Sequence, residues 1–313
     1  MTHLGWLVAA LTLGVGSASP AVPETPQTPA AERAETETLG LDIIQNHRMT
    51  VPVTIGRGGP YRFIVDTGSE RTVISREVAG QLRLGPGRPV QMHSMTEVSR
   101  VETALVPALQ VGRRIVSNIH APTLAEATLG ADGLLGVDSL VSQRVDLDFR
   151  SNEMRVTPSR EREARWTGDT IVVTGRSRFG RLILFDASFD GERVWVVVDT
   201  GSQISIANEA LRRRLVRRGR LGPTSPVQVV SVTGGTIMVD YGVARRVRIG
   251  GIDIFDLPVG FGDVEPFRKL DLLDRPAILL GMDALQLFDR VSLNFATREV
   301  RLQVPEARES EAP

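Results

Sequence analysis

The chain contains no cysteine among its 313 residues, which excludes disulfide bonds, thiolate zinc sites and a lipid anchor on an N-terminal cysteine. Only four histidines occur, without the spacing of metal ligands, so we expect neither a metal nor another cofactor. Basic and acidic residues balance at 37 each, which gives no argument for a nucleic-acid partner. Lysine is almost absent, since Lys269 is the only one; we interpret this as compositional bias rather than function.

The N-terminus also lacks an apolar run long enough to identify a membrane span. Residues 4–15 are apolar and are followed by small residues, as in a secretory signal, although no Lys or Arg precedes them. We therefore expect residues 1–21 to be a signal peptide or an uncleaved membrane anchor, and the protein to be exported, either periplasmic or anchored facing the periplasm. Residues 22–40, rich in Pro, Glu and Thr, predict a flexible tether, and a role as a pro-segment stays open.

What the chain does contain is one tetrapeptide in two copies. The sequence Asp-Thr-Gly-Ser occupies residues 66–69 and 199–202, and each copy follows a run of β-prone residues. A single Asp-Thr-Gly is more often a turn than a catalyst, because Asp bonds its own backbone and Gly accepts a positive φ. Two carboxylates held face to face, however, cannot both ionise, so they share a proton and act as an acid–base pair.

The surroundings of the two motifs are duplicated as well. Residues 89–96 align without gaps on residues 226–233, and the Leu-Leu-Gly segment at 134–136 aligns on 279–281. The offset between the copies grows from 133 at the motifs to 145 at the Leu-Leu-Gly segments, as small insertions in the second copy would cause. A repeat of this length indicates two copies of one fold unit rather than a solenoid.

With Asp-Thr-Gly, then a hairpin, then Leu-Leu-Gly before a short helix in each half, the sequence resembles the retropepsin-like aspartic peptidases, in a bacterial single-chain form with two fused halves. The resemblance implies a mainly β protein with two pseudo-twofold related β-barrel domains and a cleft between them. The first half spans residues 41–157, a linker 158–169, the second half 170–304 and a polar tail 305–313.

The resemblance also implies the site. Asp66 and Asp199 would be the catalytic pair that holds one water and hydrolyses a peptide bond without a covalent intermediate. The remaining motif residues would support them: Thr67, Gly68, Ser69, Thr200, Gly201 and Ser202. In the family the two threonines cross-bond the turns beneath the site, and we expect both serine hydroxyls to hydrogen-bond the outer carboxylate oxygens.

Two predicted hairpins, at residues 90–106 and 227–243, would be flaps that close over a peptide held by main-chain hydrogen bonds, unless they are ordinary surface hairpins. The residues at their tips are the flap candidates: Thr96, Glu97, Thr233, Gly234 and Gly235. The leucines of both Leu-Leu-Gly segments should be core residues behind the aspartate turns, followed by glycines that allow close backbone approach. Asp138 and Asp283, just after these segments, are interpreted as helix caps.

An arginine-rich run at residues 212–220 is typical of a solvated helix face, with an anionic partner or membrane as the alternative. Because both aspartates lie in one chain, we expect a monomeric aspartic endopeptidase that acts on a polypeptide substrate. A non-catalytic peptide-binding protein and an envelope-assembly protein on the same fold stay as alternatives, because fold does not guarantee function.

Overall fold

The computed structural model describes residues 49–162, 166, 168–184 and 186–305, which all belong to one compact unit. The expected signal or anchor at 1–21 and the tether at 22–40 lie outside the described residues. In the part of the chain that is described, no helix is long and apolar enough to cross a membrane.

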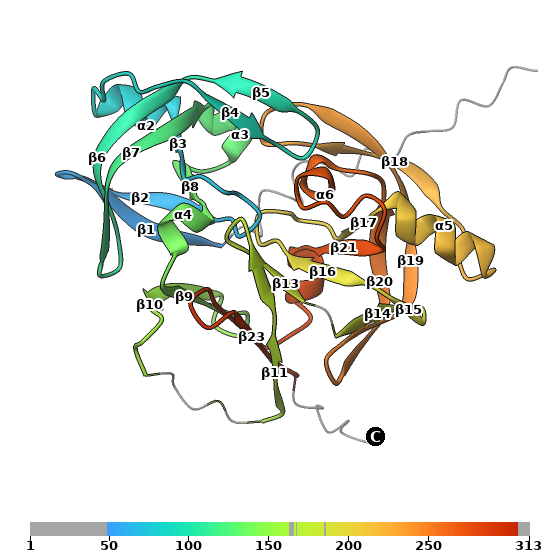
Figure 1. Ribbon diagram of the computed structural model, residues 1–313. Helices are drawn as coiled ribbons and strands as arrows, with labels where there is room; N and C mark the ends of the chain where they lie inside the picture. The colour runs from blue at the N-terminus through green and yellow to red at the C-terminus, as the bar shows by residue number, and fades with distance from the viewer. Residues whose placement is uncertain (1–48, 163–165, 167, 185, 306–313) are drawn as a thin grey trace, which may run out of the picture. The chain divides into compact units, whose positions relative to one another are not determined.

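The first half of the chain closes into a six-stranded barrel in the strand order β1-β2-β8-β3-β7-β6 (Figure 1). Strand β1 illustrates why, because alternate residues, Val51, Val53 and Ile55, are buried inside the barrel while their neighbours are not. The elements of this half are β1 (Thr50–Ile55), β2 (Gly58–Val65), β3 (Val73–Ser75), α2 (Arg76–Gln81), β4 (Val90–His93), β5 (Val98–Val101), β6 (Thr103–Val111), β7 (Arg114–Leu124), α3 (Glu126–Leu129), β8 (Gly133–Leu135), α4 (Val137–Leu140), β9 (Gln143–Asp148) and β10 (Glu153–Pro158).

The second half is built on a ten-stranded sheet in the order β12-β13-β16-β21-β17-β20-β19-β14-β15, with β18 paired to β19. Its elements are β11 (Thr170–Thr174), β12 (Arg176–Arg178), β13 (Arg181–Leu184), β14 (Ala187–Phe189), β15 (Glu192–Arg193), β16 (Trp195–Val198), β17 (Ile206–Ala207), α5 (Glu209–Arg217), β18 (Ser225–Val230), β19 (Thr236–Ile249), β20 (Ile252–Phe261), α6 (Glu265–Lys269), β21 (Ala277–Leu280), α7 (Met282–Leu285), β22 (Arg290–Asn294) and β23 (Glu299–Gln303). The mainly β fold class expected from the sequence is therefore confirmed.

A third sheet joins the two halves. Its strand order is β10-β9-β22-β23-β11, so strands of the first half lie at one side and strands of the second half at the other. The repeated strands β9 and β22 pair antiparallel with Val145 opposite Leu293 and Leu147 opposite Val291. Pairing between equivalent strands of a repeat is what a pseudo-twofold axis through this sheet would produce.

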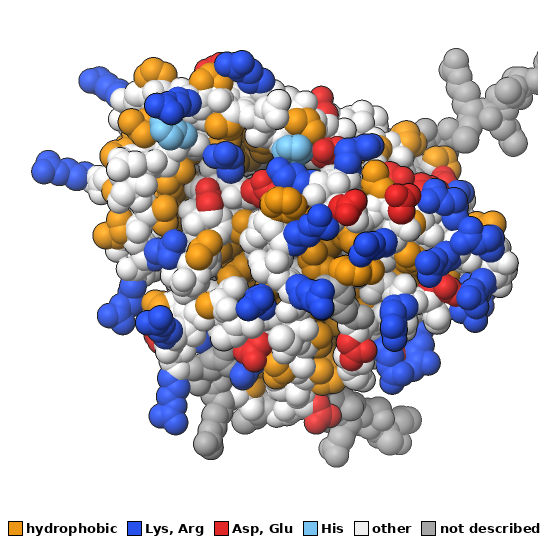
Figure 2. Space-filling view, in the orientation of Figure 1, with side chains coloured by type: hydrophobic (Ala, Val, Ile, Leu, Met, Phe, Trp, Pro, Cys, Tyr) orange, Lys and Arg blue, Asp and Glu red, His pale blue; other side chains and the backbone are white. Residues whose placement is uncertain are grey.

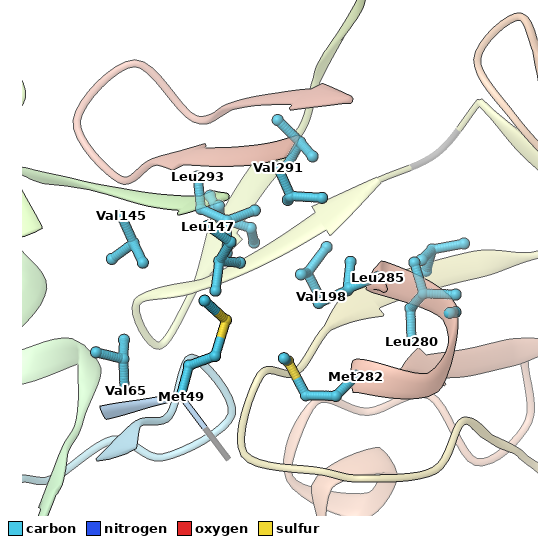
Figure 3. Close-up of a cluster of buried hydrophobic side chains, with 14 of the residues drawn as sticks. Met49, Val65, Val145, Leu147, Val198, Leu280, Met282, Leu285, Val291 and Leu293 are labelled. Carbon is cyan, nitrogen blue, oxygen red and sulfur yellow. The ribbon is translucent and has the colours of Figure 1, made fainter. Parts of the chain in front are cut away.

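The core continues from this sheet to the two Asp-bearing strands. Figure 3 shows side chains of β9 and β22 in one cluster with Val65, which ends β2, and Val198, which ends β16. All of them are less than 2 % exposed. Because one apolar cluster lies behind both strand ends, the strands cannot move apart without opening the core.

The first part of the arginine-rich run lies on α5, which ends at Arg217. Leu211 and Leu215 are buried, whereas Arg213, Arg214 and Arg217 are exposed. Figure 2 shows basic side chains gathered over this helix. The helix has the solvated basic face that such a run indicates.

Candidate active site

Each Asp-Thr-Gly-Ser motif begins where a buried strand ends. Strand β2 runs parallel to β8, and the Asp66 amide donates to the Leu135 carbonyl at 2.9 Å. In the second half β16 runs parallel to β21, and the Asp199 amide donates to the Leu280 carbonyl at 3.0 Å. Both leucines are buried, as the sequence predicts, so the Leu-Leu-Gly strands set the position of each aspartate through the main chain.

The two aspartates face one another across the halves. Asp66 Oδ1 accepts from the backbone amides of Gly68 at 2.8 Å and Ser69 at 2.9 Å, and Asp199 Oδ1 accepts from Gly201 at 3.0 Å. A Cβ on Gly68 would overlap the Asp199 carboxylate, and a Cβ on Gly201 would overlap that of Asp66. Only glycine leaves room for the opposite carboxyl group, so each turn is shaped to its partner.

The electrostatic surroundings favour one shared proton. Burial, reinforced by the negative charge of Asp199, raises the pKa of Asp66 from 3.8 to about 7. Burial also raises the pKa of Asp199, while the positive charge of Arg181 and a hydrogen bond from the Asp66 side chain oppose the rise. Two facing acids with raised pKa values titrate as a unit, and near neutral pH such a pair retains a proton.

The two threonines exchange hydrogen bonds beneath the aspartates. Thr67 Oγ1 donates to the Val198 carbonyl at 2.8 Å, and Thr200 Oγ1 donates to the Val65 carbonyl at 2.6 Å. Each hydroxyl also accepts from the backbone amide of the other threonine at 3.1 Å. Both side chains are buried, so this reciprocal set ties the two turns together where water cannot compete.

The serine hydroxyls differ from the expectation. Ser69 Oγ donates to the Arg71 carbonyl at 2.9 Å, and Ser202 Oγ donates to the Ile204 carbonyl at 2.7 Å. A backbone carbonyl two residues ahead lies within easy reach of a serine at a turn, and it uses the only hydroxyl proton. In the first half it is the Ser69 amide rather than its hydroxyl that bonds the carboxylate.

The interpretation of Asp138 and Asp283 as helix caps is wrong. Helices α4 and α7 have Gly136 and Gly281 at their N-caps, with no side-chain capping bond. The reason is that each aspartate is the second residue of its helix. From there its carboxylate reaches back to the loop that follows the Asp-Thr-Gly-Ser motif of the catalytic pair, or dyad, Asp66 and Asp199. A Cβ on either glycine would overlap that same loop, which confirms the close backbone approach expected there.

The contacts of these carboxylates identify two residues that the sequence analysis missed. Asp138 accepts from the Thr72 hydroxyl at 2.7 Å and amide at 3.0 Å, and Asp283 accepts from the Ser205 hydroxyl at 2.7 Å and amide at 2.8 Å. Thr72 and Ser205 each follow their dyad aspartate by six positions. A hydroxyl residue at the same place in both copies was the signal in the sequence that could have identified them. In each half the two hydrogen bonds hold the turn of the dyad aspartate against the short helix.

The dyad lies in a cleft of about 300 Å³ between the two predicted flaps. The cleft is lined by Asp66, Asp199, residues of β4 and β18, and residues of α3 and α6. The two segments predicted to be flaps form the antiparallel hairpins β4–β5 and β18–β19. The proposed flap residues therefore lie at the ends of two strands that line the same cleft as the dyad.

The flap candidates come together at the tips. A Cβ on Gly235 would overlap the Thr96 hydroxyl and lie 3.8 Å from Glu97 Oε1, so the two tips touch. Gly234 adopts φ 86°, and the Thr233 amide donates to the Ser231 hydroxyl at 3.4 Å. The first flap is also bonded to the second half, because His93 Nδ1 lies 3.1 Å from Glu265 Oε1. Within the described ranges no cluster of three or more His, Asp or Glu could hold a metal ion.

Facing carboxyl groups on two fused, equivalent halves, beneath paired hairpins, define an aspartic protease fold. Comparison with known proteins gives the family: the model for aspartyl proteases matches residues 51–139 and 185–284, more than half of the chain, with one motif in each segment. The chain belongs to this aspartyl protease family. Its structure is similar to that of a retropepsin-like aspartic protease from Rickettsia conorii, at 17% identity and a TM-score of 0.29, over 45% of this chain and 97% of that one. Among curated proteins none matches.

Proposed function

We propose that this protein is an aspartic endopeptidase in which Asp66 and Asp199 activate one water for attack on a peptide bond. The observation that carries the proposal is the pair of facing carboxyl groups, each lying against the glycine of the opposite turn, and burial raises the pKa of both. A paired acid and base at the floor of a cleft is the arrangement that this hydrolysis requires.

In the first step of the reaction, one aspartate would accept a proton from the water and the other would donate a proton to the substrate. The ionised carboxylate takes a proton from the water as its oxygen attacks the peptide carbonyl, and the protonated carboxyl gives its proton to the carbonyl oxygen. The tetrahedral intermediate then loses the amine: as the C–N bond breaks, the nitrogen takes a proton from the carboxyl that received it from water, and the other carboxylate takes a proton from a hydroxyl of the intermediate. The dyad returns to its starting state, and the products are a carboxylic acid and an amine. Since the pair titrates as a unit, the base is not assigned to either residue.

The surroundings of the dyad would hold and enclose the substrate. The flap strands lie across the cleft from the dyad, where an extended peptide can bond to strand edges. Closing the flaps would exclude water and strengthen the charge interactions at the reacting bond.

The test compares Asp66→Asn, Asp199→Asn and the double variant on a peptide library. Asparagine keeps the shape and acceptor atom of each turn but cannot share a proton. Each single change should therefore lower kcat/KM by orders of magnitude, and the double change should be little worse.

A matched contrast is Leu280→Ala, which should cost about 2–5 kcal/mol of stability through a core cavity while the dyad stays intact. If the wild type binds peptides but does not hydrolyse them, the protein is a peptide-binding protein and not an enzyme. If Asp66→Asn left hydrolysis intact, the paired mechanism would be excluded.

A further inference from the structure

A series of charges of alternating sign runs from the dyad along one wall of the cleft. Arg181, at the start of β13, is 3 % exposed, and its Nε donates to the Gly68 carbonyl at 2.6 Å. Its Nη1 lies 3.5 Å from Glu70 Oε1. On the other carboxylate oxygen of Glu70, Lys269 Nζ lies at 2.8 Å. The order is therefore dyad, arginine, glutamate and lysine, and the last three come from separate segments of the chain.

The series ends on Lys269 at the surface of the cleft. Lys269 lines the cleft together with Asp66, Asp199 and Arg181, and its side chain is 19% exposed. The Nζ atom of Lys269 pairs with Glu70 and lies 5.9 Å from the centre of the Phe179 ring, over its face. An ammonium group has three donors, so it can bond a further acceptor from the cleft side. Partial burial makes such a bond stronger than one at an open surface.

The position equivalent to Glu70 in the other half carries no charge. Gln203 follows Asp199 by four positions, as Glu70 follows Asp66, and it also lines the cleft. Its side-chain nitrogen is buried with no hydrogen-bond partner. The two halves therefore differ: the glutamate that holds Lys269 is replaced by a neutral amide, and the residues of α3 that line the cleft are uncharged.

We infer that Lys269 is a specificity-determining residue that selects a carboxylate side chain, Glu or Asp, at one position of the substrate peptide. The substrate carboxylate would be the next member of the alternating series, with Lys269 between it and Glu70. Because the other end of the cleft is neutral there, the preference should be confined to one side of the scissile bond. A preference measured in kcat/KM rests on the proposed peptidase function.

The test uses pairs of peptides that differ only in Glu or Gln, scanned through the positions on both sides of the cleaved bond. The wild type should prefer Glu at one position by about tenfold in kcat/KM, the size expected of a hydrogen bond between charged groups in a partly wet site. Lys269→Met, which keeps the length of the side chain, should abolish the preference for Glu over Gln. Lys269→Arg should retain it.

The control is Arg213→Met on α5, which removes one positive charge from an exposed site outside the cleft. It should keep the full preference, which separates local recognition from the net charge of the protein. Raising the salt concentration should shrink the preference, since the site is partly open to solvent. Equal cleavage of Glu and Gln peptides by the wild type, or an unchanged preference in Lys269→Met, would overturn the inference.

A binding measurement keeps this test separate from the test of the reaction. Fluorescence anisotropy with the same labelled peptides reports the charge preference whether or not they are cleaved. If nothing is cleaved but the Glu peptide binds more tightly, and Lys269→Met removes the difference, the proposed hydrolysis fails and the recognition site stands. If the peptides are cleaved without a charge preference, the proposed hydrolysis stands and the recognition site at Lys269 fails.

Discussion

Asp66→Asn should make the folded protein less sensitive to pH as well as inactive. The pKa of Asp66 is raised from 3.8 to about 7, so the folded protein holds this proton more tightly than the unfolded chain does. Unfolding therefore releases a proton throughout this interval, and the free energy of unfolding falls as the pH rises through it. The stability that the protonated acid provides is complete below about pH 4 and is lost by about pH 7.

The size of the effect follows from the same values. A rise in pKa from 3.8 to about 7 corresponds to a loss of at most about 4 kcal/mol across the interval, at roughly 1.4 kcal/mol per pKa unit. Asparagine keeps an acceptor for the amides of Gly68 and Ser69, and it does not ionise. The variant should therefore match the wild type near pH 4 and exceed it at pH 7, with a smaller slope that comes from Asp199.

Urea unfolding followed by circular dichroism, at intervals from about pH 4 to about pH 7.5, measures these free energies directly. The control is Asp274→Asn, which changes an exposed aspartate of the second half and should leave the wild-type slope unchanged. Unchanged m-values would show that the variants alter stability rather than the size of the transition. Parallel pH curves for Asp66→Asn and the wild type would refute the shared proton.

Two further predictions concern the joined turns and the single chain. Thr200→Val removes the donor to the Val65 carbonyl and the acceptor for the Thr67 amide, so it should lower the free energy of unfolding by about 2–5 kcal/mol, measured in urea, whereas Thr200→Ser should cost much less. Activity per molecule should stay constant on dilution, because one chain supplies both aspartates; a loss of specific activity that tracks dissociation in sedimentation would contradict this.

The residues near the dyad motifs show how far local pattern extends. Asp66 and Asp199 could be paired from the sequence because the strand, the turn and the Leu-Leu-Gly segment all occur twice. The burial of Leu135 and Leu280 followed from the same repeat. The hydrogen bonds within turns and the period-two pattern of strands depend mainly on residues close in the chain, so the sequence predicts them.

Side-chain partners were predicted less well, because a side chain bonds whatever the fold brings near it. Asp138 bonds Thr72, which is 66 positions away, and Asp283 bonds Ser205, 78 positions away. Both aspartates resembled caps because only their own helices are visible in the sequence. The prediction for the serine hydroxyls was wrong because of a local contact. Each hydroxyl bonds a carbonyl two residues ahead instead of the carboxylate.

The sequence by itself determined the two equivalent halves, the mainly β class and the pair of carboxylates, because each depends on a pattern that the chain repeats. Only the tertiary structure decided the charges around that pair. Glu70, Arg181 and Lys269 come from the two halves and have no shared motif, and Lys269 looked like a compositional accident. Their interaction exists only because the fold brings three distant segments to one wall of the cleft, where partial burial makes each charge depend on its neighbour.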